Sequence, residues 1–422
     1  MVSETASGGG FLSAAELKES VRRLLDHVGE KHRVLIIPPD RSRFASRAGL
    51  ITRMIADYYG SALAAVLPAT GTHAPLSVID RRAMFGDLPE TLFLTHDFRD
   101  GCVTMGRVPA DYVREISAGK CEFDWPVEID RLIVEGGFDL ILSIGQVVPH
   151  EVAGMSNYTK NVLIGAGGAE GIDKSHYLGA VSGMERIMGK IDTPVRRLLD
   201  HAAGRFFQGL PLLYLHTVIG TDTAGTTGVA GFFAGDDEEC FTGAAELSRK
   251  LNITLLPEPL SKVVVYLDPE EYRSAWLCNK GIYRTRMAIE DHGTLVVLAP
   301  GMERFGEDDT IDALIRKYGY RGTETVQRLV TERADLRANL AVAAHLIHGS
   351  TEGRFQVVYA PGRLGREAIE GVGYEFAAYE TLCSRYDPAK LREGRQRFPD
   401  GEEIFFIKNP ALGLWAWADK FR

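Results

Sequence analysis

Short apolar runs bounded by turn residues alternate along the chain with longer segments that mix polar and apolar positions. The segment 12–29 has the spacing of an amphipathic helix, with Ser13 as its N-cap. Three apolar runs predict strands that are buried on both faces, at 33–39, 61–71 and 139–148. This alternation is typical of an α/β fold with parallel strands.

The same pattern continues to the end of the chain, after a Pro-containing joint at 256–262. Before the joint, strands joined by turns are expected within 217–236 and a helix at 238–251. After it we expect strands at 262–267, 294–301 and 354–360, one helix within 270–290, and one long helix within 324–348.

The length of the chain, 422 residues, exceeds what one hydrophobic core usually fills. We therefore predict two α/β domains with largely parallel sheets and an active site in the cleft between them. The N-terminal domain is expected to comprise 1–257 together with 408–422, whose two Trp pack back onto it. The C-terminal domain is expected to comprise 258–407.

Composition excludes several functions. The net charge is −9, from 48 basic and 57 acidic side chains, which argues against a nucleic-acid-binding surface. Five cysteines occur without CxxC spacing, so we expect reduced structural thiols and no zinc site. The N-terminus has no basic start, and no apolar run reaches the roughly 18 to 20 residues that span a bilayer. We expect a cytoplasmic protein with no membrane partner.

Ionisable groups follow each of the first three strands. Asp40 and Arg43 come after the first, His73 after the second and His150 after the third. Each alone is explained as a helix cap or a loop residue. Because ligands bind beyond the carboxyl ends of parallel strands, the three together indicate a site, and histidine suits acid–base chemistry near neutral pH.

Two further sequence features carry candidate chemistry. The stretch 147–176 places His150, Lys160 and His176 around many glycines, directly after a buried strand. His345 and His348 have HxxH spacing, but no carboxylate lies between them as in HExxH, so we interpret them as structural.

Four segments, in this order, resemble the nickel-pincer lactate racemase family and its homologues that act on other 2-hydroxy acids. They are PPDRSR (38–43), ATGTH (69–73), VVPHEVAGMSNYTKN (147–161) and GIDKSH (171–176). The resemblance covers most of the N-terminal domain. Its specificity comes from the set and its spacing, and not from any single motif.

The resemblance implies a nicotinic-acid-derived mononucleotide whose sulfur substituents hold nickel through an S–C–S pincer. Lys160 would carry this cofactor through a covalent thioamide, and His176 would complete the nickel coordination. Glycine would keep the backbone close to the flat cofactor. Separate maturation proteins would build the cofactor and would be partners of the chain.

The resemblance also assigns roles at the substrate. His73 and His150 would be the acid/base pair that moves the hydroxyl proton, while hydride passes reversibly between C2 and the cofactor. Asp40 and Arg43 would lie on the substrate side, with Arg43 binding the carboxylate. From the C-terminal domain, Lys280 would face the substrate. The expected activity is a racemase or C2-epimerase of 2-hydroxy acids.

The chain departs from the family pattern at two places. Leu277 stands where the lactate-specific pattern has glutamine, which favours a larger or sugar-derived acid over lactate. NYT at 157–159 replaces the common Gly-Gly before Lys160. Near Lys280, Arg284 and Arg286 are interpreted as a solvated helix face, with binding of a longer acid as the alternative.

Two other function classes stay open. One is a nicotinamide-dinucleotide oxidoreductase. The sequence argues against it, because no GxGxxG fingerprint follows a strand at the start of a βαβ unit, and the glycine-rich GAGGAEG (165–171) lacks that context. The other is a paralogue that binds nucleotide or metal without catalysis. Whether the protein forms a homo-oligomer is also open.

Overall fold

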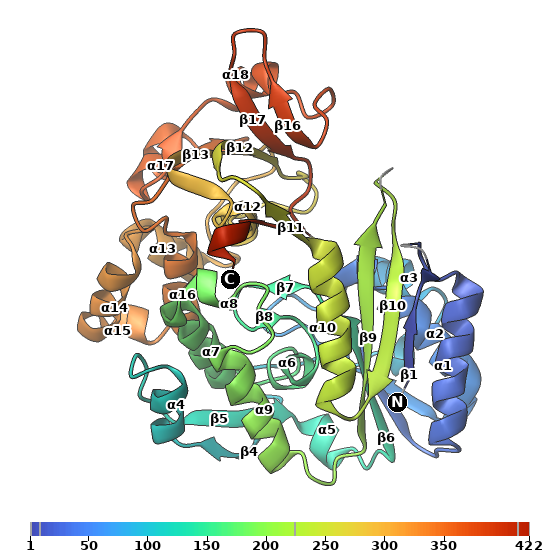
Figure 1. The fold of residues 1–422 in the computed structure, drawn as a ribbon. Coiled ribbons are helices and arrows are strands. Elements are labelled where there is room, and N and C mark those ends of the chain that lie inside the picture. Colours follow the sequence, from blue (N-terminus) through green and yellow to red (C-terminus); the bar gives the residue numbers. More distant parts are fainter. Residues whose placement is uncertain (1, 8–9, 223–224, 412, 422) are drawn as a thin grey trace. The chain divides into compact units, whose positions relative to one another are not determined.

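The computed structural model describes residues 2–7, 10–222, 225–411 and 413–421 (Figure 1). The chain divides into two compact units. The first comprises residues 1–175 and 187–252, and the second comprises 176–186 and 253–422. Each unit is built around a six-stranded sheet with helices, which is the mixed α/β class expected from the sequence.

The sheet of the first unit has the order β1-β10-β9-β6-β2-β3. Its strands are β1 (Val2–Thr5), β10 (Thr227–Gly235), β9 (Leu212–Thr221), β6 (Leu140–Gln146), β2 (Val34–Ile37) and β3 (Leu63–Val66). The pairs from β9 to β3 are parallel, and the pairs that β10 makes with β9 and β1 are antiparallel. Every residue of β2 and β6 is buried, as their uninterrupted apolar runs predict.

Helix α1 (Ala14–Val28) begins where the sequence predicts. Ser13 and Glu16 form a reciprocal capping box at its start. The other helices of this unit are α2 (Ala48–Tyr59), α3 (Val78–Phe85), α4 (Ala110–Ile116), α5 (Arg131–Glu135), α6 (Thr159–Leu163), α9 (Pro194–Phe206) and α10 (Glu238–Asn252). Two small antiparallel pairs complete it: β4 (Cys102–Val108) with β5 (Trp125–Asp130), and β7 (Pro149–His150) with β8 (Gly154–Met155).

Two helices cross the boundary between the units along the chain. They are α7 (Ala169–Ser182) and α8 (Met184–Ile187). Within the second unit, Glu185 of α8 forms ion pairs with Arg354 at 2.6 Å and with Arg286 at 3.5 Å. These ion pairs connect the segment 176–186 to residues 253–422, with which it forms the second unit.

The sheet of the second unit has the order β15-β14-β13-β12-β17-β16. Its strands are β15 (Glu375–Phe376), β14 (Gln356–Pro361), β13 (Ile289–Ala299), β12 (Leu260–Tyr266), β17 (Glu403–Ile407) and β16 (Gly394–Arg397). All neighbours are parallel except β16 and β17. Val264, Leu298 and Phe406 belong to a buried cluster on this sheet.

The helices of the second unit are shorter than the sequence suggests. They are α11 (Ala275–Cys278), α12 (Lys280–Thr285), α13 (Asp309–Tyr318), α14 (Thr323–Glu332), α15 (Ala334–Arg337), α16 (Leu340–Gly349), α17 (Arg366–Gly371) and α18 (Tyr379–Arg385). The prediction of a single helix within 270–290 is wrong. The chain turns at Asp268, and helical structure starts only after Ser274, whose side chain caps α11.

The prediction of one long helix within 324–348 is also wrong, because α14, α15 and α16 occupy this range. Arg333 has the extended conformation φ −115°, ψ 112°, which ends α14. Asn339, with φ −137° and ψ 63°, then separates α15 from α16. Neither break is marked by glycine or proline, so periodicity alone joined the three pieces.

The C-terminal strand groups with the second unit, whereas the sequence analysis places 408–422 with the first. Strand β18 (Leu414–Trp417) pairs in parallel with β11 (Ile253–Leu256). The backbone N–H of Trp417 also donates to the carbonyl of Met287. Among the described residues, no helix combines the length and apolar character that crossing a membrane requires.

Candidate active site

Asp40 and His73 lie together beyond the carboxyl ends of β2 and β3. Asp40 Oδ2 is 2.5 Å from His73 Nδ1, and Asp40 Oδ1 accepts hydrogen bonds from the backbone N–H of Ser42 at 3.0 Å and its hydroxyl at 2.5 Å. Burial opposes ionisation of Asp40, but the hydrogen bonds from His73 and Ser42 and the charge of Arg43 lower its pKa to about 2. The carboxylate is therefore ionised and accepts only.

The loop 69–73 is tied to two other parts of the first unit. Ala69 N donates to Pro38 O at 2.7 Å, which continues the pairing of β2 with β3. Gly71 N donates to Gly165 O at 2.8 Å, and Gly71 has φ +55°, a conformation that favours glycine. His73 is thereby held between the end of β2 and the loop that follows α6.

His150 lies on a tight hairpin after β6 and is buried. Its Nδ1 accepts hydrogen bonds from the backbone N–H groups of Val152 at 3.1 Å and Ala153 at 3.4 Å. The hydroxyl of Ser156 donates to Gln146 O at 2.6 Å and so fixes the hairpin to the end of β6.

Lys160 lies in the first turn of α6 and is half-buried. Its pKa is lowered to about 8, mainly by burial and then by the charge of Arg43; Glu151 and Asp40 act in the opposite direction. The amine is therefore within electrostatic range of groups that follow β2 and of a residue next to His150. Its neutral, nucleophilic form is available near pH 8.

The turn before Lys160 is strained. Asn157 has φ +67° and Tyr158 has φ +61°, in the left-handed region that costs most residues free energy. Both residues belong to the NYT segment at 157–159, where the sequence departs from the resembling pattern. Asn157 Nδ2 is 2.9 Å from His216 Nδ1, and the Tyr158 ring stacks on Phe241 at 5.1 Å, so packing holds the two residues in this conformation.

Arg196 on α9 holds the same turn. Its buried guanidinium donates to Thr159 Oγ1 at 2.9 Å, Met155 O at 2.8 Å and Asn157 O at 3.2 Å. Thr159 in turn donates to Asp200 at 2.6 Å. Arg196 could not be identified from the sequence, because an arginine in an amphipathic helix gives no signal that distinguishes a buried side chain from a surface one.

Asn161 fixes α6 to the sheet. Its Nδ2 donates to Ser143 Oγ in the middle of β6 at 2.9 Å and to Ile37 O at the end of β2 at 3.2 Å. The residue directly after the proposed anchor is thus a buried positioning group. Asn161 was not among the residues predicted for the site, although it lies inside one of the resembling motifs.

The glycines after α6 serve the backbone itself. A Cβ at Gly165 would lie 2.5 Å from Asn161 O, and one at Gly167 would lie 2.0 Å from Leu163 O. Both glycines are therefore required for the chain to fold back across α6, whatever ligand binds nearby. The Gly167 carbonyl also accepts from His96, whose other ring nitrogen is 2.7 Å from Asp130.

The second unit carries the other two proposed site residues. His176 lies on α7 and Lys280 at the start of α12, and both are half-buried. Lys280 Nζ lies 5.8 Å from the centre of the Tyr272 ring. The preceding residue, Asn279, accepts a hydrogen bond from Tyr359 at 2.6 Å, which fixes the start of the helix.

His345 has a structural environment, as predicted for the HxxH spacing. Its Nδ1 is 2.9 Å from the Tyr283 hydroxyl and its Nε2 is 2.9 Å from the Tyr320 hydroxyl, while Trp276 stacks on the ring at 4.4 Å. No group of three or more His, Cys, Asp or Glu side chains suited to a metal ion occurs within the described ranges.

The interpretation of Arg284 and Arg286 as a solvated helix face is wrong. Both are buried, at 1% and 4% relative exposure. Arg286 donates to the carbonyls of His348 and Ser350, besides its ion pair with Glu185. These contacts of Arg286 lie within the second unit, so its guanidinium stabilises that unit internally.

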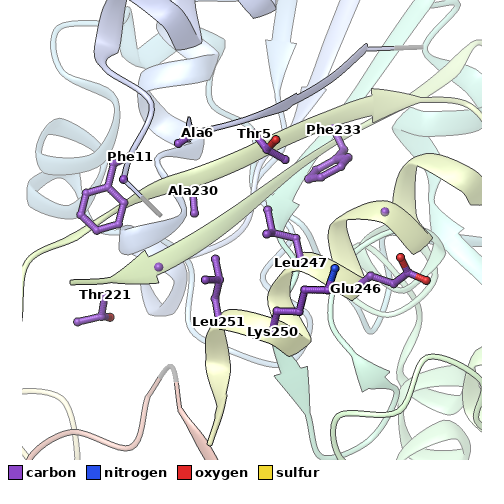
Figure 2. A pocket seen from close by; sticks show the side chains of 13 residues that line it. Thr5, Ala6, Phe11, Thr221, Ala230, Phe233, Glu246, Leu247, Lys250 and Leu251 are labelled. Carbon is purple, nitrogen blue, oxygen red and sulfur yellow. The ribbon is translucent and has the colours of Figure 1, made fainter. Parts of the chain in front are cut away.

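A separate cavity of ≈ 440 Å³ lies in the first unit, beside β1, β9, β10 and α10 (Figure 2). Phe11, Phe233, Leu247 and Leu251 give it apolar walls. None of the described residues that line it is a proposed site residue.

The chain is similar to known proteins both in sequence and in fold. Residues 15–188 match the lactate racemase N-terminal domain family. A lactate racemase from Thermoanaerobacterium thermosaccharolyticum is 27% identical over 299 residues, which cover 68% of this chain and 64% of that protein. The alignment thus spans just under two thirds of the relative's own length.

Two solved structures share the fold. A protein from Thermotoga maritima superposes with a TM-score of 0.80 at 23% identity, covering 96% of this chain and 98% of that one. The lactate racemase apoprotein from T. thermosaccharolyticum gives a TM-score of 0.70 at 18% identity, covering 94% and 92%. At these identities the likeness establishes the α/β fold. Residues 15–188, which contain all four resembling motifs, are thus similar to the lactate racemase N-terminal domain family.

Proposed function

We propose that this protein is a racemase or C2-epimerase of 2-hydroxy acids that uses a nickel-pincer nucleotide attached at Lys160. The observation that supports this most directly is the environment of Lys160. A half-buried amine with a pKa of about 8 lies within electrostatic range of Asp40, Arg43 and Glu151, at the carboxyl ends of the parallel strands.

The residues fit the proposed cofactor chemically. Forming a thioamide requires an amine that is nucleophilic near neutral pH, which the lowered pKa of Lys160 provides. A neutral imidazole such as His176 is a suitable nickel ligand. A single protein ligand suffices when the organic group brings the other donor atoms. When bound, the cofactor would accept the C2 hydrogen with both electrons and return it.

The chain's own side chains would bind the acid and move its proton. The guanidinium of Arg43 can hold both oxygens of the carboxylate. His73, with Nδ1 on the Asp40 carboxylate, can take the hydroxyl proton at Nε2, and the carboxylate would balance the charge that forms. His150 and Lys280 would complete the polar contacts of the substrate. The C2 hydrogen would leave with both of its electrons while the hydroxyl proton is taken. No carbanion would then form at C2, next to the negatively charged carboxylate.

A larger or sugar-derived 2-hydroxy acid is the proposed substrate. Leu277 and Trp276 are half-buried and lie three and four residues before Lys280 in the chain, and Trp276 is held flat against His345 at 4.4 Å. A fixed indole face and an aliphatic side chain suit the carbon skeleton of such an acid better than a small polar contact does. If the substrate has further stereocentres, the reaction is a C2 epimerisation.

Maturation proteins that build the nucleotide are proposed partners, and the cytoplasm is the proposed location. The test is therefore co-expression with such proteins, followed by intact mass measurement and nickel analysis. We expect an adduct of nucleotide size on Lys160 and one nickel per adduct. Lys160→Arg should abolish the adduct, whereas Lys174→Arg, on α7, should keep it.

Activity is then measured by proton NMR of candidate 2-hydroxy acids in light water and in D2O. We expect interconversion at C2 with the C2 hydrogen largely retained, because the hydride returns to the same carbon. An adduct on another residue, or rapid exchange of the C2 hydrogen with solvent, would refute the proposal.

A further inference from the structure

We propose that His96 is a positioning residue for the anchor of the site. Together with Asp130 it holds the buried segment 165–168, which follows α6. This segment contacts both the helix of Lys160 and the turn before His73. The proposal rests on the proposed function for the roles of these two residues. The hydrogen bonds that carry it lie outside the four resembling motifs.

Both ring nitrogens of His96 are engaged inside the protein. The side chain of His96 has no exposed surface, and that of Asp130 is 9% exposed. Nδ1 is 2.7 Å from Asp130 Oδ2, so a hydrogen lies between the ring and the carboxylate. Nε2 is 3.0 Å from Gly167 O, and because a carbonyl can only accept, Nε2 carries hydrogen and donates it. The ring therefore connects Asp130 to Gly167.

Asp130 is linked to the segment 165–168 in two ways. Its backbone N–H donates to Ala166 O at 2.8 Å, and its side chain reaches Gly167 O through the His96 ring. The other carboxylate oxygen accepts from Leu132 N at 3.0 Å, which fixes the direction of the carboxylate. These contacts form a closed ring of hydrogen bonds. The segment cannot move along β5 without breaking at least one of them.

The held segment connects two parts of the proposed site. Gly165 N donates to Lys160 O at 3.2 Å, so the segment completes the last turn after α6. Gly165 O accepts from Gly71 N at 2.8 Å, and Gly71 lies two residues before His73. The contact that His96 makes with Gly167 is only two residues further along the chain. Loss of that contact should therefore loosen the end of α6 and the surroundings of the Lys160 amine.

The two ring nitrogens can be separated by substitution. Glutamine places an amide N–H near the position of histidine Nε2, and asparagine places one near Nδ1. His96→Gln therefore keeps a donor for Gly167 O, whereas His96→Asn keeps only a donor for Asp130. Both variants lose one buried hydrogen bond and should lose comparable stability. A role limited to stability would affect the site equally in both, but the proposed role requires that only glutamine preserves it.

The test uses full-length protein expressed without maturation proteins, and the quantity measured is the pKa of the Lys160 amine. Trace acetylation with acetic anhydride over a range of pH, quantified by peptide mass spectrometry, gives this pKa, with the exposed Lys18 as internal reference. We expect a pKa of about 8 in wild type and in His96→Gln. In His96→Asn it should rise towards 10.5, because a loosened segment lets water reach the amine.

Equal pKa values of Lys160 in the two variants, raised or not, would overturn the proposal. Urea unfolding establishes that both variants are folded and similar in stability. If His96→Asn does not fold, hydrogen exchange of the wild type decides. The backbone amides of 165–168 should then be protected as strongly as those of β5, and faster exchange would show that the segment is not held.

The consequence for attachment is measured after co-expression with maturation proteins. We expect roughly tenfold less adduct on Lys160 in His96→Asn than in wild type, and near-normal attachment in His96→Gln, because a displaced amine reacts poorly. Equal losses in the two variants would also count against the proposal. A wild-type protein that takes up no adduct would instead refute the proposed function, and the pKa measurements would still decide the role of His96.

Discussion

The guanidinium of Arg196 donates a hydrogen bond to the hydroxyl of Thr159, the residue directly before Lys160, at 2.9 Å. Through this contact and two backbone carbonyls, α9 holds the strained turn that leads into α6. The position of the proposed anchor therefore depends on a residue from a distant part of the chain.

Removing this contact should destabilise the protein and reduce attachment at Lys160. We expect Arg196→Met to lower the free energy of unfolding by about 3 kcal/mol, because the variant removes the buried positive charge beside Asp200 and the donor to two backbone carbonyls. Urea unfolding measures the first effect and intact mass the second. Arg197→Met, which removes an exposed ion pair with Asp192, is the control and should cost less than about 1 kcal/mol.

Lys160 should destabilise the protein before it is modified. Its pKa is about 8 in the folded state and 10.5 without the fold, so the charged form is disfavoured by folding. Below pH 8 this cost is fully present, and it disappears as pH rises from 8 to 10.5. We expect Lys160→Met to be more stable than wild type by about 3 kcal/mol at pH 7, with the difference vanishing near pH 10.5. A difference that is constant with pH would contradict the lowered pKa.

Asp40 should contribute stability that is lost in acid. Its pKa falls from 3.8 to about 2 on folding, so the contribution is present above pH 4 and disappears as pH falls through 2. We expect Asp40→Asn to remove about 2 kcal/mol of this pH-dependent stability. Unfolding curves of the two proteins between pH 5 and pH 2 measure it, and parallel curves would show that the carboxylate is not stabilised by His73 and Ser42.

The close approach at Gly167 gives a prediction with a matched control. Gly167→Ala would place a methyl group 2.0 Å from Leu163 O, so the backbone must shift, and we expect a loss of about 1–3 kcal/mol. Gly204 is exposed on α9, and a Cβ there would meet nothing within 4 Å, so Gly204→Ala should stabilise the protein by about 0.5–1 kcal/mol. Thermal and urea unfolding compare the two. Equal effects would mean that Gly167 is not required by packing.

Leu277 should determine part of the substrate preference. If Leu277 replaces a polar contact to a small acid, Leu277→Gln should raise kcat/KM for lactate relative to larger 2-hydroxy acids by roughly tenfold, the value of about one hydrogen bond. Rates with a series of acids of increasing length measure the ratio. An unchanged ratio would remove Leu277 from the specificity of the site.

Most of the fold could be predicted from local pattern. The buried strands β2, β3 and β6 and the helices α1 and α10 lie where apolar spacing and Ser13 place them. The order of ionisable groups after strands also indicated where chemistry could occur. These features are local, since each depends on neighbours a few positions apart in the chain.

The remaining features depend on contacts between distant residues. The breaks at Arg333 and Asn339, the burial of Arg286 against Glu185 and the attachment of β18 to β11 have no local signal. The same holds for Arg196 and for the contacts of Nδ1 in His73 and in His150. A sequence names the titratable groups, but which nitrogen carries a proton is decided by the donors and acceptors that the tertiary structure brings against it.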